Sequence, residues 1–221
     1  MNILGLDTSS SGSAVAVLRD DGAGFSCDPA PDALLGPPGH SRDLLPAAAM
    51  ALQQAGLEWT HLDAVAVGVG PGAFTGLRIG VATARALAAA RALELYAVSS
   101  LRALALAIDA PLALALIDAR RGEVFAALYE GEREVWPPFA AAPDALLTRL
   151  ADAPGAPVAA GNGSLRFRRI LEDGGVCVPP ADSGSHVVSG LSICRLARMS
   201  PPTPLEAAVP NYLRDPDAQP Q

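Results

Sequence analysis

The sequence contains no lysine, and all 16 of its Lys and Arg residues are arginine. A Walker-type phosphate loop and a Schiff-base nucleophile both need a lysine, so these two classes of enzyme are excluded. Acidic residues number 23, which gives a formal net charge of −7. Contact with nucleic-acid phosphates depends on positive charge, so we do not expect this chain to provide the main surface that grips a nucleic acid.

Cysteine is scarce as well, and long apolar runs are missing. The three cysteines, Cys27, Cys177 and Cys194, stand far apart without a CxxC pair, so we predict reduced thiols with neither a disulfide framework nor a zinc site. No apolar run is long enough for a transmembrane helix, and the residues after Met1 lack the basic stretch and cleavage site of a signal peptide. We therefore expect a cytoplasmic protein.

Half of the 221 residues are apolar, which is enough to bury a sizeable core. In the first part of the chain, the pattern predicts strands over residues 3–6, 13–18 and 63–69 and helices over residues 41–56 and 77–93. Ser41 is expected to cap the first of these helices, and Gly56 is expected to end it. A polar turn over 7–12 joins the first two strands, and a Gly-rich loop over 70–76 leads into the second helix.

The second half repeats this plan in weakened form. Asp118 follows an apolar strand over 112–117, as Asp7 follows the first strand, and Gly122 then opens a strand over 123–128. A shorter copy of the apolar strand and glycine loop lies over 158–163, before a predicted helix over 165–171.

A last helix is predicted over 191–199. The Pro-rich tail from Pro201 is expected to be loose, except where residues 210–214 dock. We therefore predict an α/β fold of two tandem lobes with mixed sheets and flanking helices, in which a complete lobe over 1–106 precedes a reduced lobe over 107–221.

The strand, Asp and turn at the start, the Gly-Pro-Gly loop and the duplicated lobe resemble the superfamily of actin, hexokinase and heat-shock ATPases, which has an actin-like (RNase H-like) fold. Within it, residues 70–80, GPGAFTGLRIG, look like the signature of the TsaB (YeaZ) family. Asp7-Thr8, His40 ahead of residues 44–46, residues 117–124 and Tyr212-Leu213-Arg214 follow in that family's order.

This resemblance implies a non-catalytic partner subunit of the machinery that places threonylcarbamoyl on adenosine 37 of tRNA (t6A). In that family the chain pairs with TsaD, the threonylcarbamoyltransferase, and the ATPase TsaE joins the assembly. Contact with tRNA is expected through the complex, and a homodimer is expected when the chain is alone.

The resemblance also implies no catalytic residue, no metal site and no cofactor of its own. TsaD carries a metal site with two histidines in an HxxxH arrangement, whereas His40, His61 and His186 do not form that motif. We expect His40 to form a hydrogen bond or to pack, and not to act as a base.

Weak contact with ATP or ADP and Mg at the complex is the one ligand interaction that the motifs favour. A tight turn and a helix N-terminus offer backbone amides to phosphate, and a carboxylate can hold a hydrated metal ion. The candidate residues are Asp7, Thr8, Ser9, Gly70, Gly72 and Thr75. The turn after Asp7 can also be a solvated hairpin turn, and the loop over 70–76 can be a strand-to-helix turn that needs glycine. We favour these structural interpretations over nucleotide turnover.

The two helices of the first lobe supply the predicted surface for TsaD or for a second copy. The helix over 77–93 is apolar or small almost all round, which lets another helix approach closely. The predicted interface residues are Leu45, Ala48, Leu52, Arg78, Ala82, Arg85, Ala86 and Ala89. A role in the core alone is the alternative for these helices.

The main alternative function is a small-molecule kinase or ATPase of the actin-like superfamily, with Asp7 as the metal-linked carboxylate and Asp118 as a second acidic group. A peptidase is a third interpretation, although no GxSxG motif occurs. The arginine clusters at Arg120-Arg121 and at Arg166, Arg168 and Arg169 are candidates for tRNA contact or for ordinary surface charge.

Overall fold

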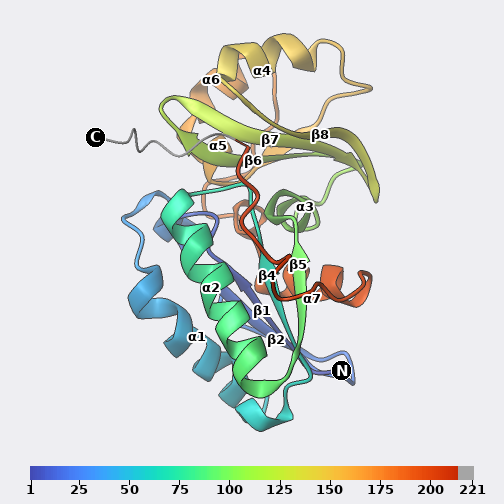
Figure 1. The fold of residues 1–221 in the computed structure, drawn as a ribbon. Coiled ribbons are helices and arrows are strands. Elements are labelled where there is room, and N and C mark those ends of the chain that lie inside the picture. The colour runs from blue at the N-terminus through green and yellow to red at the C-terminus, as the bar shows by residue number, and fades with distance from the viewer. Residues whose placement is uncertain (214–221) are drawn as a thin grey trace, which may run out of the picture.

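We describe residues 1–213 of a computed structural model (Figure 1). Their strands form a five-stranded sheet in the order β3-β2-β1-β4-β5 and a four-stranded sheet in the order β8-β7-β6-β9. The second sheet repeats the order of the first without its fifth strand. This repetition confirms the predicted α/β fold of two similar halves with mixed sheets and a reduced second half.

The first sheet is built around β1, which is buried along its whole length. Its strands are β1 (Ile3–Asp7), β2 (Ala14–Leu18), β3 (Gly24–Ser26), β4 (Ala64–Gly68) and β5 (Glu94–Val98). β2 runs antiparallel to β1, whereas β4 runs parallel to β1 and β5 parallel to β4. The apolar sequences of β1, β2 and β4 suit strands that are covered on both faces.

The second sheet contains β6 (Leu112–Arg120), β7 (Glu123–Glu130), β8 (Arg133–Ala141) and β9 (Val158–Ala160). A tight hairpin joins β6 to β7, and both Arg121 and Gly122 have positive φ, at 52° and 81°. No sequence pattern indicated β8, because this strand contains Pro137 and Pro138. Proline lacks the amide that a central strand needs, and β8 lies at the edge of the sheet, where this loss is tolerated.

Helices and sheets alternate through the molecule (Figure 1). The helices are α1 (His40–Gln54), α2 (Phe74–Arg91), α3 (Ser100–Ala105), α4 (Pro143–Leu150), α5 (Asn162–Arg166), α6 (Arg168–Asp173) and α7 (Gly190–Arg198), with single turns η1 (Pro31–Leu35), η2 (Trp59–His61) and η3 (Gly184–His186). Helices α1 and α2 cover one face of the first sheet, and their buried side chains form one core cluster with it. Helices α4 and α6 cover the outer face of the second sheet in the same way.

The core between the two sheets joins the halves of the molecule. Helices α3 and α7 supply Leu101, Leu104 and Ile193 to this cluster, and the second sheet supplies Ile117 and Phe125. Because α7 follows the second sheet in sequence but packs on β1 and β2, the chain crosses back to the first sheet at its end. The division of the chain at residues 106 and 107 stays a prediction.

Three predicted helix boundaries differ from the structure. Helix α1 begins at His40, so Ser41 lies in its first turn and does not cap it, although Gly56 follows its end with a φ of 66° as expected. Helix α2 begins at Phe74 and not at residue 77, so its first turn contains the last three residues of the expected loop. The helix expected over 165–171 is broken at Phe167 into α5 and α6.

The expectation of a loose tail is wrong for residues 203–208. The amide of Thr203 donates a 2.6 Å hydrogen bond to the carbonyl oxygen of Leu95, and its hydroxyl accepts from the amide of Ala97 at 3.1 Å. Ala208 is fully buried. The outer edge of β5 has backbone groups that no strand pairs with, and the tail forms hydrogen bonds with them. Docking of the predicted segment begins at Asn211 as expected, and Arg214 lies outside the described residues.

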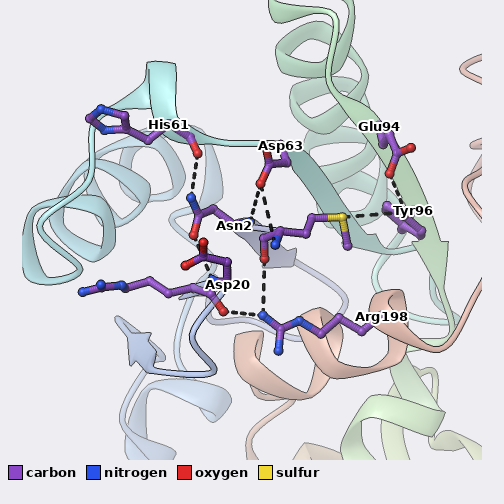
Figure 2. A network of polar contacts seen from close by, with 9 residues as sticks. Asn2, Asp20, His61, Asp63, Glu94, Tyr96 and Arg198 are labelled. Carbon is purple, nitrogen blue, oxygen red and sulfur yellow. Dashed lines mark hydrogen bonds and ion pairs between the residues drawn. The ribbon is translucent and has the colours of Figure 1, made fainter.

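A polar network fixes the start of β1, at the end of the sheet that carries the N-terminus (Figure 2). The side chain of Asn2 donates to the carbonyl oxygen of His61 at 2.9 Å and accepts from the amide of Asp20 at 2.9 Å. Arg198 of α7 donates to the carbonyl oxygens of Met1, at 3.3 Å, and Arg19. These bonds hold α7 against the first sheet.

Candidate functional site

Asp7 lies at the end of β1 and is enclosed by hydroxyl groups. Its Oδ1 accepts hydrogen bonds from the amide and the hydroxyl of Ser9, at 2.8 Å and 2.6 Å. Its Oδ2 accepts a 2.6 Å bond from the hydroxyl of Ser100, which itself accepts from the amide of Gly70 at 3.1 Å. A Cβ at Gly68 would overlap Oδ2, so β4 closes a further side of the carboxylate.

Burial raises the pKa of Asp7 above its ordinary value, although the hydrogen bonds from Ser100 and Ser9 act in the opposite direction. The residue is 1% exposed. With both oxygens engaged inside the protein, the carboxylate acts as an acceptor that fixes the turn after β1. Sequence reasoning missed Ser100, although a polar residue just after an apolar strand is a usable signal for such a site.

Thr8 and Ser9 hold the start of α2 against this turn. The hydroxyl of Thr8 donates a 2.7 Å hydrogen bond to the carbonyl oxygen of Gly76, and the carbonyl oxygen of Ser9 accepts from the amide of Ala73 at 2.8 Å. A Cβ at Gly76 would overlap the carbonyl oxygen of Thr8, and one at Gly80 would overlap its hydroxyl. The glycines of the signature therefore allow the close packing of α2 on the turn.

A cleft of about 410 Å³ lies between the two halves of the molecule. Its lining comes from Ser10 and Ser11, the starts of α1 and α2, the end of β6, and the tail at Asn211, Tyr212 and Leu213. Of the six candidates for nucleotide contact, Gly72 and Thr75 line this cleft. Asp7, Thr8, Ser9 and Gly70 are not among its lining residues.

The tail wall of the cleft is fixed by an aromatic and arginine cluster. The rings of Phe74 and Tyr212 lie 5.0 Å apart, and the guanidinium of Arg78 lies 3.9 Å above the ring of Phe74. Arg78 also donates a 3.1 Å hydrogen bond from Nε to the hydroxyl of Tyr212. The backbone amide of Asn211 donates to the carbonyl oxygen of Val69 at 2.7 Å. Arg78, predicted to contact a partner, thus also anchors the tail.

Asp118 ends the apolar part of β6, as Asp7 ends β1, but it lines the cleft. Its Oδ2 lies 3.4 Å from Arg120 and 3.5 Å from Arg166, and its Oδ1 accepts from the amide of Arg120 at 2.9 Å. The two predicted arginine clusters therefore meet at one carboxylate. Arg168 and Arg169 lie apart from it and form ion pairs with Glu172 and Asp173 of their own helix.

His40 is buried at the start of α1. Its Nδ1 lies 2.8 Å from the hydroxyl of Ser13, as expected for a hydrogen-bonding histidine, whereas Nε2 has no partner among residues 1–213. Burial lowers the pKa of His40, against the opposing effects of the Ser10 backbone and of Asp43. In the second half, His186 is also buried, and its ring contacts Ser164 and the carbonyl oxygens of Pro179 and Pro180.

The predicted interface residues divide into two groups. Leu45 is 51% exposed on α1, and Arg78, Ala82, Ala86 and Ala89 form an exposed face of α2, with Arg85 half-buried beside them. Ala48 and Leu52, also on α1, are 0% and 2% exposed. These two side chains pack in the core beneath α1, so they offer no surface to a partner. Spacing alone did not show which face of the helix meets the sheet.

No cluster of three metal-binding side chains occurs among residues 1–213. Over the same residues, no helix is both long and apolar enough to cross a membrane.

Two sheets of this repeated order, with a cleft between the halves, define a protein of the actin-like (RNase H-like) class. Residues 37–192 match the family model described as TsaD, tRNA N6-adenosine threonylcarbamoyltransferase. The chain is 30% identical to the tRNA threonylcarbamoyladenosine biosynthesis protein TsaB of Escherichia coli, over 97% of this chain and 95% of that protein.

The TsaB protein of Bacillus subtilis is 34% identical over 59% of this chain and 56% of its own length. The solved structure of YeaZ from Pseudomonas aeruginosa matches with a TM-score of 0.77 and 29% identity, and covers 96% of this chain and 99% of that one. The chain belongs to the TsaB (YeaZ) family of threonylcarbamoyladenosine biosynthesis proteins.

Proposed function

We propose that this chain is the non-catalytic partner subunit of a TsaD-type threonylcarbamoyltransferase and acts in the cytoplasm in the formation of t6A at position 37 of tRNA. The observation that carries this proposal is the match to the Escherichia coli TsaB protein over 97% of the chain. TsaE and tRNA would join through the complex. Weak contact with ATP or ADP and Mg at the complex stays a prediction.

The geometry around Asp7 supports a role without catalysis. A carboxylate that serves a metal-bound phosphate needs a free oxygen facing the ligand. Here both oxygens already accept hydrogen bonds from Ser9 and Ser100, and Asp7 is 1% exposed and does not line the cleft. This arrangement weighs against the alternative of a kinase or ATPase that uses Asp7 and Asp118.

The outer face of α1 and α2 supports a partner role. Leu45 is half exposed, and Met50, five residues further along α1, is 54% exposed. Ala82, Ala86 and Ala89 give α2 a face of small side chains, on which a helix of another subunit can pack closely. We infer that TsaD binds here, and that a second copy of the chain takes the same face when TsaD is absent.

Reconstitution tests the function. The cognate TsaD and TsaE, ATP, threonylcarbamoyl-AMP and unmodified tRNA are combined with and without this chain, and modified adenosine is measured. We expect modification to require both this chain and TsaD. Equal modification without this chain would contradict the proposal.

The surface is tested by Ala86→Glu, with Ala145→Glu on the exposed face of α4 as the matched control. A buried glutamate without a partner opposes association, so Ala86→Glu should abolish co-purification with TsaD. Because both alanines are exposed, both variants should keep the melting temperature of the parent protein. Co-purification that survives Ala86→Glu would exclude this face of α2.

A further inference from the structure

We propose that a groove at the C-terminal ends of α1 and α2 holds an apolar side chain and a neighbouring carboxylate of the TsaD-type subunit, with Trp59 and Arg91 as its main contacts. The proposal rests on the proposed function and deepens it, because it states where the partner is anchored and by which chemistry. The groove and the cleft between the two halves share no lining residue in the described part of the chain.

Helices α1 and α2 lie side by side, and the groove lies beside their C-terminal ends (Figure 1). It has a volume of about 450 Å³, and its lining includes Ala49, Leu57, Trp59 and Arg91. Leu57 and Trp59 are half-buried against the core cluster of the first sheet, so each keeps some surface for contact. Tryptophan and arginine are among the residues that most often dominate the binding energy of an interface. The groove thus has the composition of an anchoring pocket.

The groove continues the proposed partner surface along α1. Ala49 follows Leu45 by four residues, and Gln53, which also lines the groove, follows Ala49 by four. Residues four apart lie on the same face of a helix, so these three side chains form one stripe, and all three are exposed. A partner that covers Leu45 therefore reaches the groove two turns further along the helix.

The charge of the two helices indicates the chemistry of the occupant. The chain has a net charge of −7, yet α1 and α2 together contain four arginines and one acidic residue, Asp43. Asp43 already pairs with Arg42 at 2.7 Å. Arg91 is exposed in the last turn of α2, and its guanidinium forms no ion pair within residues 1–213. An arginine of this kind favours a partner that brings a carboxylate.

The other polar group of the groove does not neutralise Arg91. The carboxylate of Glu58 accepts a hydrogen bond from the amide of His61 in the capping box of η2. Trp59 combines an apolar ring with an N–H donor, which suits an apolar side chain next to a polar group. The occupant is therefore an aliphatic or aromatic side chain against Leu57 and Trp59, with a carboxylate on Arg91.

A second copy of this chain does not meet this requirement. A copy that packs on the same face brings its own arginines, its α2 has no acidic residue, and the carboxylate of its Asp43 is paired. Such a copy can cover the alanines of α2 and still leave Arg91 without an anion. A TsaD-type subunit with an acidic and apolar segment gains a contact that the homodimer lacks.

The test uses the two tryptophans of the chain, Trp59 in the groove and Trp136 in β8. The whole chain is labelled with fluorotryptophan, unlabelled cognate TsaD is added, and fluorine NMR follows both resonances, which Trp136→Phe assigns. We expect the Trp59 resonance to shift and the Trp136 resonance to stay, because the partner changes the surroundings of the groove alone. Raising the concentration of the chain without TsaD should shift neither resonance.

Charge reversal tests the role of Arg91. Arg91→Glu should weaken the binding of TsaD by about tenfold or more in a binding titration, because the variant repels the carboxylate that the wild type attracts. Arg195→Glu is the matched control. Arg195 is also exposed in the last turn of its helix, α7, so both variants lose the same favourable interaction with a helix end. Arg195 lies outside the groove, and its replacement should leave the affinity unchanged.

Filling the groove gives a second variant that does not depend on charge. Ala49→Trp places a large side chain at an exposed lining position, so the melting temperature should stay that of the parent protein while the affinity for TsaD falls by about tenfold. Ala145→Trp, at an exposed position of α4, should change neither quantity.

The results separate this proposal from the proposed function. If TsaD binds and Ala86→Glu abolishes that binding, the partner role stands. An unmoved Trp59 resonance, or wild-type affinity in Arg91→Glu, would then overturn the groove alone. A Trp59 shift in the chain without TsaD would assign the groove to a second copy and would also overturn the proposal. If the wild-type chain does not bind TsaD, both proposals fail.

Discussion

The hydroxyl of Ser100 donates a 2.6 Å hydrogen bond to Oδ2 of Asp7 and joins the end of β1 to the helix that leads to the second sheet. Ser100 also accepts from the amide of Gly70, so one hydroxyl connects β1, α3 and the signature loop. All of these groups are buried, which makes each bond costly to break. The position of the signature loop therefore depends on a residue that follows β5.

Asp7→Asn should be tolerated, whereas Asp7→Ala should not. Asparagine keeps an oxygen for Ser9, and its amide can donate to the Ser100 hydroxyl, so we expect the free energy of unfolding to change by less than about 1 kcal/mol. Alanine leaves buried groups of Ser9 and Ser100 without a partner and should cost about 2–4 kcal/mol. Urea unfolding measures both changes.

The same Asp7→Asn variant distinguishes the proposed function from a kinase or ATPase. In the reconstituted t6A assay we expect it to retain activity, because the carboxylate serves the fold. Loss of activity without loss of stability would assign the charge of Asp7 a chemical role and would favour the enzyme alternative.

Protonation of the two buried histidines should lower the stability of the protein as the pH drops below about 6.5, the ordinary pKa of histidine. Burial lowers the pKa of both His40 and His186 in the folded protein, so in this range the unfolded chain binds more protons. The stability that each neutral ring provides is therefore complete above the unfolded pKa and is lost as the pH falls towards the folded one. His40→Gln and His186→Gln should each flatten this dependence, measured by urea unfolding from pH 7.5 to pH 5.5, relative to wild type. A slope that neither variant changes would contradict the burial of neutral rings.

Gly76→Ala should destabilise the protein, because its Cβ would overlap the carbonyl oxygen of Thr8 and a backbone atom cannot easily move aside. We expect a loss of about 1–3 kcal/mol, the usual cost of overpacking. Gly184→Ala is the matched control, since nothing lies within 4 Å of the added Cβ. Thermal melts of both variants check the prediction, and equal melting temperatures would contradict the close contact.

Alanine substitutions at Leu45 and Leu52 of α1 should differ in their effects on stability and on TsaD binding. Leu52→Ala removes a side chain that is 2% exposed and should cost about 2–4 kcal/mol of stability. Leu45→Ala removes a half-exposed side chain, so stability should change by less than about 0.5 kcal/mol while affinity for TsaD falls. Melting temperature and a TsaD binding titration separate the two. Unchanged affinity in Leu45→Ala would remove this residue from the interface.

Sequence patterns predicted the elements whose signal is local. The strands of the first sheet around Asp7, the helices α1 and α2, and the repeat at Asp118 all follow from apolar runs and glycines. The boundary of α2 was missed because Gly76 reads as a loop residue, whereas its missing Cβ serves contact with Thr8. The orientation of α1 was missed because alanine and leucine occur on both of its faces.

The contacts that build the cleft join distant parts of the chain, and no local pattern encodes them. Ser100 and Asp7 are 93 positions apart, and Arg78 and Tyr212 are 134 apart. The motifs placed Tyr212 in order but could not say that it would pack on Phe74. Only the packing of the two sheets brings Arg120 into the same cleft as the start of α2.

The hydrogen bonds of Thr203 to Leu95 and Ala97 bear on how this protein avoids pairing its strands with those of other copies. β5 is the last strand of its sheet, and a bare strand edge is a template for pairing with another chain. By lying along that edge, the tail acts as a shield against aggregation. A chain shortened before Thr203 would keep most of its sheet residues and yet expose a strand edge on which copies can pair.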